Sequence, residues 1–318
     1  MSKGGWLAGL SEEYLMCVYL RETGLALLVT AAYSLFSLTC QFAEAAPLKV
    51  MPLGDSITAG ESDTDYRTRL WQRFGSDPTK LDFLGSQFSG PAALGDKFHE
   101  GHPGYTIAYE PAAAFGNLTD NVARWLPVGQ RSPVFPDIIL LMIGTNDVNN
   151  VAVQTPSAPE RLSHLISLIS DPVIGRSPQS KLIVSTLLPI DDSNATFRTI
   201  PNDFSRNARV TAFNSALPAI VAAHRADGEN VFFFDMNARF TVSDIKDGLH
   251  PYPAGNEKLG DGWYDAIQGV LVPEPESFIF SAAALLVEVG WLRDRRRQIS
   301  PRFRRLNRLE NQHWMQHT

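Results

Sequence analysis

Five apolar runs recur along the chain, and most of them are continuous rather than alternating. They occupy residues 48–53, 81–85, 137–144, 181–188 and 230–235. Continuous apolar runs of this length are typical of strands buried on both faces of a parallel sheet. The pattern therefore predicts a central parallel sheet that is covered by helices on both sides.

Segments with apolar residues three and four positions apart lie between these runs, and each predicts a helix. They cover residues 65–74, 159–170, 207–226 and 254–271. Pro218 falls inside the third segment and is expected to kink or split that helix, because proline has no amide hydrogen to donate. The alternation of strands and helices predicts a single three-layer α/β/α domain over residues 46–272.

The N-terminal segment has the pattern of an export signal. An apolar run at 24–39 follows Arg21 and precedes an Ala-Glu-Ala triplet at 43–45, a small-x-small pattern that signal peptidases read. Residues 1–45 are therefore interpreted as a signal peptide, and a start of translation closer to Arg21 would explain their length. The alternative is an N-terminal membrane anchor.

The C-terminal segment also departs from the strand–helix alternation. Residues 273–297 contain Pro-Glu-Pro, a short apolar stretch interrupted by Glu288, and an arginine cluster. This combination resembles the PEP-CTERM sorting signal of exported bacterial proteins, which an exosortase is thought to process. A terminal amphipathic helix with a solvated basic face is the alternative. The basic tail at 298–318 is not part of the sorting pattern.

Charge and cysteine content narrow the functional classes. The net charge is −6, but the charged residues are unevenly distributed. Residues 46–292 contain 18 basic and 28 acidic residues, whereas residues 293–308 contain eight arginines. An acidic body argues against a nucleic-acid partner, and the basic end fits a membrane or sorting role. Cys17 and Cys40 both precede the predicted cleavage, so a mature exported protein would lack disulfides and thiol catalysis.

A polar triplet, Gly54-Asp55-Ser56, ends the first predicted strand. These three residue types favour turns, so the triplet has a purely structural interpretation. The alternative is that Ser56 is a nucleophile at the carboxyl edge of the sheet, where open α/β folds bind their ligands.

A serine nucleophile needs a base and a group that orients the base. Asp247 and His250 lie three residues apart, just before the last predicted helix. At that spacing the carboxylate can bind imidazole Nδ1 and leave Nε2 for Ser56. Alone, the pair is a weak signal, and it gains weight only together with the serine.

Ester chemistry also needs donors for a developing oxyanion. The Asn146 side chain follows a predicted strand, Gly104 could present an unobstructed N–H, and the Ser56 N–H is a third candidate. Turn formation alone would also explain Gly, Asn and Asp after a strand. The HEGH stretch at 99–102 does not have the H-E-x-x-H spacing of a zinc site, and the chain contains no G-x-S-x-G; no metal or cofactor is expected.

Four separated blocks together resemble the SGNH (GDSL) hydrolase superfamily. They are Gly54-Asp55-Ser56, the glycine of HPGYT, Gly144-x-Asn146-Asp147 and Asp247-x-x-His250. The stretches at 51–71 and 82–107 look most like carbohydrate esterase family 3, the acetyl xylan esterases.

The resemblance implies a flavodoxin-like α/β/α fold and assigns roles to residues. Ser56 would be the nucleophile, His250 the general base and then acid, and Asp247 its orienter; Ser56, Gly104 and Asn146 would donate to the oxyanion. Asp55, His102 and Tyr105 are candidate substrate contacts.

The hypothesis is an exported serine esterase that removes small acyl groups, with acetyl on carbohydrate favoured. Four aromatic residues could stack on sugars or could simply pack in the core: Tyr66, Trp71, Tyr105 and Tyr252. The alternatives are a lipolytic esterase or thioesterase on the same scaffold, and a non-catalytic module that binds surface polysaccharide.

Overall fold

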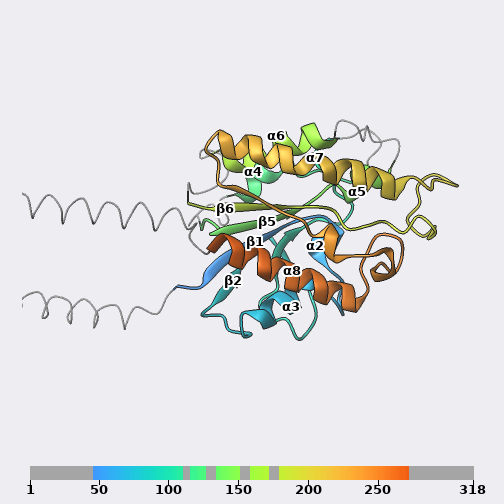
Figure 1. The fold of residues 1–318 in the computed structure, drawn as a ribbon. Helices are drawn as coiled ribbons and strands as arrows, with labels where there is room; N and C mark the ends of the chain where they lie inside the picture. Colours follow the sequence, from blue (N-terminus) through green and yellow to red (C-terminus); the bar gives the residue numbers. More distant parts are fainter. Residues whose placement is uncertain (1–45, 110–114, 127–133, 151–157, 172–178, 272–318) are drawn as a thin grey trace, which may run out of the picture.

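The computed structural model describes residues 46–109, 115–126, 134–150, 158–171 and 179–271 (Figure 1). The predicted signal peptide, the sorting segment and the basic tail lie outside these residues. Within them, the chain forms a seven-stranded sheet between two layers of helices. The predicted three-layer α/β fold is confirmed.

The five predicted strands all form and pair in parallel with their neighbours. They are β1 (Leu48–Gly54), β2 (Leu81–Phe83), β5 (Ile138–Met142), β6 (Lys181–Ser185) and β7 (Val231–Phe234). Every residue of β5 is buried, as expected for a strand with helices on both faces.

Two further strands were not predicted. β4 (Phe98–Gly101) runs parallel to β1, and β3 (Gln87–Phe88) pairs antiparallel with β4 at the sheet edge. Neither has an apolar run, because they are short and β4 carries His99 and Glu100. The strand order is β3-β4-β1-β5-β6-β7, with β2 also paired to β1.

The register of β1 brings three strand ends together. Residues 48–50 of β1 pair with β2, whereas Leu53 and Gly54 pair with Glu100 and Gly101 of β4. On its other edge β1 pairs along its length with β5. The carboxyl ends of β4, β1 and β5 therefore lie side by side, at the edge where open α/β sheets bind ligands.

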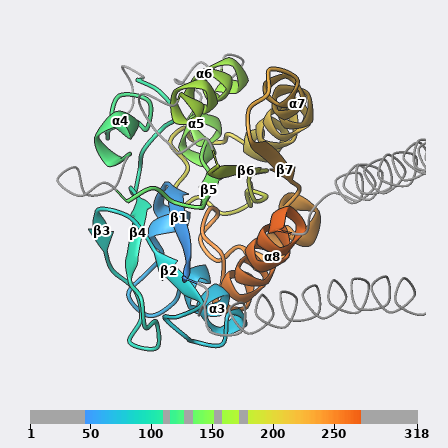
Figure 2. The ribbon, with the colours of Figure 1, turned by 90° about the vertical axis from the view of Figure 1, so that its left-hand side faces the viewer.

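Helices cover both faces of the sheet (Figures 1 and 2). One layer contains α4 (Val122–Trp125), α5 (Thr145–Asn149), α6 (Ala158–Ser170) and α7 (Arg206–Ala226); the other contains α3 (Tyr66–Arg73) and α8 (Pro253–Leu271). The one-turn helix α2 (Ser56–Ala59) follows β1, and the 3₁₀ turns η2 (Asn237–Arg239) and η3 (Val242–Asp244) follow β7. Among the described helices, none has the length and apolarity needed to cross a bilayer.

The four long helices lie where the apolar spacing predicts them, and the structure decides two points that the sequence left open. Pro218 does not split α7, which is continuous over 21 residues. Pro218 is exposed, so the carbonyl that loses its partner can turn to water. Tyr66 and Trp71 cannot stack on a sugar, since both are buried in the core beneath α8 and β2.

Candidate active site

Ser56 is the first residue of α2, directly after β1, rather than part of an open turn. Asp55 caps this short helix through a hydrogen bond from the Ile57 N–H to its Oδ1 (3.0 Å). Gly54 is required just before it: a Cβ there would lie 2.2 Å from the Met142 carbonyl oxygen of β5. The close approach of β1 and β5 thus fixes the position of the serine.

The structure brings Ser56, His250 and Asp247 together. His250 Nε2 lies 2.9 Å from Ser56 Oγ, and His250 Nδ1 lies 2.9 Å from Asp247 Oδ2. An ionised Asp247 can only accept, so Nδ1 carries the proton and Nε2 is left to accept from the serine hydroxyl. This is the arrangement that a serine nucleophile and its base require.

Asp247 is held in its ionised form by the local backbone. Its Oδ1 accepts hydrogen bonds from the N–H groups of His250 (2.8 Å) and Leu249 (3.0 Å). Partial burial opposes ionisation of Asp247, but these two N–H groups and the His250 side chain outweigh it and lower the pKa of the carboxyl. The same contacts fix the carboxylate relative to the imidazole.

The two other predicted oxyanion donors lie on the loops that flank Ser56. Asn146 is in the first turn of α5, after β5, and its Nδ2 donates one hydrogen to the Tyr105 carbonyl (2.8 Å). Its second amide hydrogen is not used by that bond. Gly104 lies in the turn after β4, whose His102 N–H donates to the Gly54 carbonyl (2.9 Å).

Gly104 adopts a conformation that favours glycine. Its φ is +79°, and a Cβ there would meet the Phe115 ring at 2.4 Å. The turn is therefore adapted to a residue without a side chain. Its role as an oxyanion donor stays a prediction.

His102 and Tyr105, two of the predicted substrate contacts, form an aromatic stack beside the site. The His102 ring stacks on Tyr105 and on Trp125, with centroid distances of 4.8 and 4.2 Å. Those two rings are 6.4 Å apart, so the three rings form a compact cluster. His102 Nε2 also contacts Glu100 Oε1 (2.5 Å). His102 and Tyr105 are both partly buried in this cluster, and their contact with substrate stays a prediction.

Glu100 and His99 of the HEGH stretch have structural partners. Buried Glu100 accepts from the Ser86 N–H (2.6 Å) and hydroxyl (2.8 Å). His99 Nδ1 accepts from the Gly101 N–H (3.0 Å), so Nε2 carries the proton toward Ser89 (2.7 Å). Burial, together with the positive charge of Arg67, lowers the pKa of His99 to about 3 and keeps the ring neutral.

Asp55 is placed unfavourably for the substrate contact expected from sequence. Its side chain is fully buried beneath the nucleophile, so no surface is left for a ligand. Burial raises the pKa of Asp55 to about 6, although the Ile57 N–H, His250 and Thr145 act in the opposite direction. Asp55 therefore influences the site as a buried neighbour of Ser56 that caps α2.

Phe197 is a site residue that the sequence did not indicate. Its ring packs edge-on against the His250 imidazole, with centroids 5.2 Å apart and planes at 81°. It lies in an irregular loop after β6 that has neither a motif nor an apolar period. A single phenylalanine in such a loop gives no sequence signal.

Comparison with known proteins gives consistent matches. The model of the GDSL-like lipase/acylhydrolase family matches residues 53–258. A multidomain esterase of Ruminococcus flavefaciens is 30% identical over 262 residues, which are 78% of this chain and 32% of that protein. The alpha2 subunit of Homo sapiens platelet-activating factor acetylhydrolase IB is 26% identical over 162 residues, 51% of this chain and 65% of the subunit. The chain thus spans less than two thirds of either relative.

Two solved structures share the fold. A Clostridium thermocellum family 3 carbohydrate esterase superimposes with a TM-score of 0.51 at 30% identity, covering 69% of this chain and 94% of that one. A carbohydrate esterase family 3 protein from Talaromyces cellulolyticus gives 0.53 at 25% identity, covering 70% and 97%. Both resemble this chain over nearly their whole length.

Proposed function

Since this chain belongs to the GDSL-like lipase/acylhydrolase family, we propose that it hydrolyses small acyl esters, acetyl above all, on carbohydrate. The observation that carries the proposal is the hydrogen-bonded series Ser56–His250–Asp247 at the carboxyl edge of the sheet. The resemblance to family 3 carbohydrate esterases supports the substrate class.

The geometry supports a two-step mechanism. His250 Nε2 takes the proton of Ser56 Oγ as this oxygen attacks the ester carbonyl, and Asp247 stabilises the imidazolium that forms. The alcohol leaves with that proton, and an acyl-serine remains. His250 then deprotonates a water molecule, which releases the acid and regenerates the serine.

The oxyanion of both tetrahedral intermediates would lie among the donors that flank Ser56. The N–H groups of Ser56 and Gly104 and the free amide hydrogen of Asn146 are the proposed donors. Each such donor typically contributes about 10²–10³-fold to the rate. The bond from Asn146 to the Tyr105 carbonyl would hold its amide in a fixed orientation.

A lipolytic ester or thioester is the second candidate substrate. The similarity to a platelet-activating factor acetylhydrolase subunit favours it, although that match covers only half of this chain. A non-catalytic polysaccharide-binding module is less compatible with the site, because binding alone does not require an imidazole aligned between a serine and a carboxylate.

Ser56→Ala tests the catalytic proposal. The variant should lose at least about 10³-fold in kcat on acetyl esters while its thermal unfolding stays close to wild type, because the nucleophile is removed with little change in packing. Thr68→Ser on α3, away from the site, removes one methyl group and keeps the hydroxyl, and serves as the control. Acetate release by folded Ser56→Ala at the wild-type rate would exclude Ser56 as nucleophile.

A substrate panel separates the candidates. Acetylated xylan and acetylated monosaccharides should be hydrolysed with a higher kcat/KM than acyl esters of increasing chain length. A preference for long acyl chains or thioesters would exclude acetylated carbohydrate as the main substrate and favour a lipolytic ester or thioester. Binding of glycan with no turnover of any ester would favour the binding module.

Export is also part of the proposal, on sequence grounds alone. The mature enzyme would act in the periplasm, at the cell envelope or outside the cell, after cleavage by signal peptidase near residue 45. The segment 273–297 would direct it to an exosortase-type machinery. Its substrate partner would then be an acylated glycan or another small ester outside the cytoplasm.

A further inference from the structure

An irregular segment after β6, residues 191–197, packs directly against the loop that carries Asp247 and His250. We call it the 191–197 strap. The Asp191 N–H donates to the Gly248 carbonyl (3.1 Å), and Asn194 Nδ2 donates to the Lys246 carbonyl (3.4 Å). At its other end, the Phe197 ring meets His250. The strap therefore contacts the catalytic loop at several successive points.

Gly248 is a residue of the catalytic loop that faces the strap. It lies between Asp247 and Leu249 at a φ of +97°, and a Cβ there would already touch Asn194 at 3.4 Å. The positive φ favours glycine at this position, and the strap passes close to the backbone next to the catalytic carboxylate.

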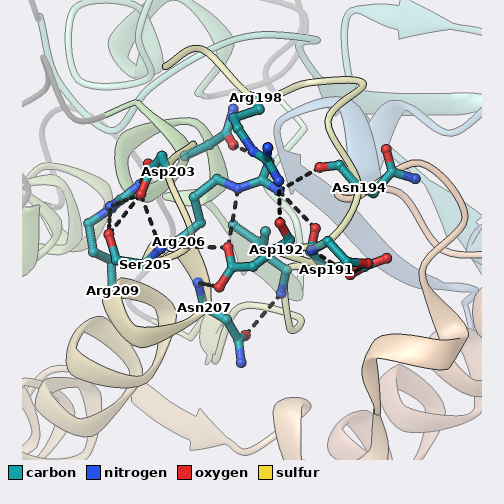
Figure 3. A network of polar contacts seen from close by, with 12 residues as sticks. Asp191, Asp192, Asn194, Arg198, Asp203, Ser205, Arg206, Asn207 and Arg209 are labelled. Atoms are coloured by element: carbon teal, nitrogen blue, oxygen red, sulfur yellow. Dashed lines mark hydrogen bonds and ion pairs between the residues drawn. The ribbon is translucent and has the colours of Figure 1, made fainter. Parts of the chain in front are cut away.

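One buried guanidinium fixes the strap (Figure 3). Arg206, the first residue of α7, is fully buried. Its Nη2 donates to two strap carbonyls, Asp191 O (2.8 Å) and Asn194 O (2.7 Å). Its Nε donates to the strap carboxylate Asp192 Oδ1 (3.2 Å), and its Nη1 donates to Asn149 Oδ1 of α5 (3.3 Å).

Asn149 extends this anchor to Phe197. It accepts from Arg206 through Oδ1 and donates through Nδ2 to the Phe197 carbonyl (2.9 Å). Asn149 is the last residue of α5, the short helix that also carries Asn146. The strap is therefore tied both to the helix with the proposed oxyanion donor and to the loop with the base.

The buried charge of Arg206 favours one conformation of the strap over others. Removing a guanidinium from water is costly unless its N–H groups find acceptors. Two of its four acceptors are carbonyls of the irregular strap backbone, which supplies them only in one arrangement. The strap conformation that satisfies Arg206 is also the one that presents Phe197 to His250.

We propose that Arg206 and Phe197 are positioning residues for His250. Arg206 fixes the strap, and the Phe197 ring restricts rotation of the imidazole, so that Nε2 stays directed at Ser56 Oγ. The Asp247 bond alone holds one ring nitrogen and leaves the imidazole free to tilt about it. This inference rests on the proposed function of Ser56 and His250. Because Phe197 is still 42% exposed, it can also contact the substrate beside His250.

The first test replaces the ring and the anchor separately. Phe197→Ala and Arg206→Lys should each lower kcat on a small acetyl ester about 10-fold or more, with KM changed less, because misplacement of a catalytic group by about 1 Å can cost up to 10² in rate. Phe197→Tyr keeps the aromatic contact and should retain near wild-type kcat. The rate constant for fluorophosphonate labelling of Ser56 should fall in parallel with kcat.

Arg209→Lys is the matched control. Arg209 lies one turn further along α7 and is also part of a polar network, but its partners are Asp203, Ser205 and the Val148 carbonyl of α5, none of which belongs to the strap (Figure 3). Its kcat and labelling rate should stay at wild-type values even if its unfolding temperature falls. If Arg209→Lys and Arg206→Lys lost kcat equally, the loss would reflect general destabilisation and not positioning of His250.

The double variant Phe197→Ala/Arg206→Lys decides whether Arg206 acts through the strap. Residues that act as one unit give non-additive losses, so the double variant should be little worse than the more impaired single variant. Fully multiplicative losses, a change in KM alone, or unchanged labelling of Phe197→Ala would overturn the proposal. If Ser56 of the wild type were not labelled at all, the proposed function itself would fail instead.

Discussion

At the scale of single residues, the site depends on a carboxyl group that is unfavourably buried. Asp55 is fully buried between the nucleophile and the end of β5, and one of its oxygens lacks a hydrogen-bond partner among the described residues. Burial is the main cause of its raised pKa, and the nearby Asp147 adds to it; the Ile57 N–H, His250 and Thr145 act in the opposite direction. The protein keeps this group although its ionised form opposes folding.

The pH dependence of stability should reveal Asp55. Its pKa is about 6 in the folded protein against 3.8 as its ordinary value. The folded state therefore holds the proton more tightly, and the cost of ionised Asp55 is absent below pH 4 and complete above pH 6. Asp55→Asn removes this cost. The unfolding free energy of the variant minus that of wild type should therefore rise by up to about 3 kcal/mol between pH 4 and pH 7.

Chemical denaturation across that pH range measures the effect. Gln72→Ala, an exposed neutral change on α3, should follow the wild-type curve at each pH. If the stability difference between Asp55→Asn and wild type were the same at pH 4 and pH 7, Asp55 would not titrate in this range.

At the scale of elements, the long periodic segments were predictable and the short ones were not. The apolar runs of β1 and β5 and the apolar faces of α6 and α8 reflect burial, which leaves a clear pattern in sequence. β3 and β4 are too short and polar for such a pattern, and α2 and α5 are single turns. These short elements nevertheless carry Ser56 and Asn146, because they form where strands end.

The contact between β1 and β5 gives a prediction at this scale. Gly54→Ala should lower the unfolding free energy by at least about 3 kcal/mol and abolish activity, because the new methyl group would overlap the Met142 carbonyl of a buried strand. Thermal or chemical unfolding measures this. Gly269→Ala in α8 is the control. Apart from the backbone of its own helix, no atom of the described residues lies within 4 Å of a Cβ there, so the change should be neutral or stabilise by up to about 1 kcal/mol.

A Gly54→Ala protein as stable as wild type would mean that the strands can separate locally. In that case the close approach would not define the position of Ser56.

At the scale of the whole molecule, four sequence blocks converge because the sheet is parallel. Order and spacing indicated Ser56, Asp247 and His250, and the structure brings them to hydrogen-bond distance. Sequence could not indicate Phe197, Asn149 and Arg206, whose roles arise from one irregular segment folding over the site. It also could not tell that Asp55 is buried, since an Asp beside a nucleophile looks the same whether it faces substrate or core.

The export proposal is a prediction about the whole chain. Expressed in a Gram-negative host, the full chain should place esterase activity outside the cytoplasm, whereas a variant without residues 2–45 should keep it inside. Fractionation combined with fluorophosphonate labelling measures both. Removal of residues 273–318 is the matched change at the other end, and should alter retention at the envelope but not translocation. Cytoplasmic activity of the full chain would contradict the proposed leader.

Ser56 and His250 are 194 residues apart in sequence although their side chains touch. During synthesis the nucleophile therefore emerges long before its base, and an incomplete chain holds a serine with nothing to activate it. Because a contact of this separation requires a long segment of chain to close, we expect the two residues to meet late in folding. If Ser56 and His250 act as proposed, ester hydrolysis should begin only when folding is nearly complete. The time at which hydrolysis appears would then report when the native structure has formed.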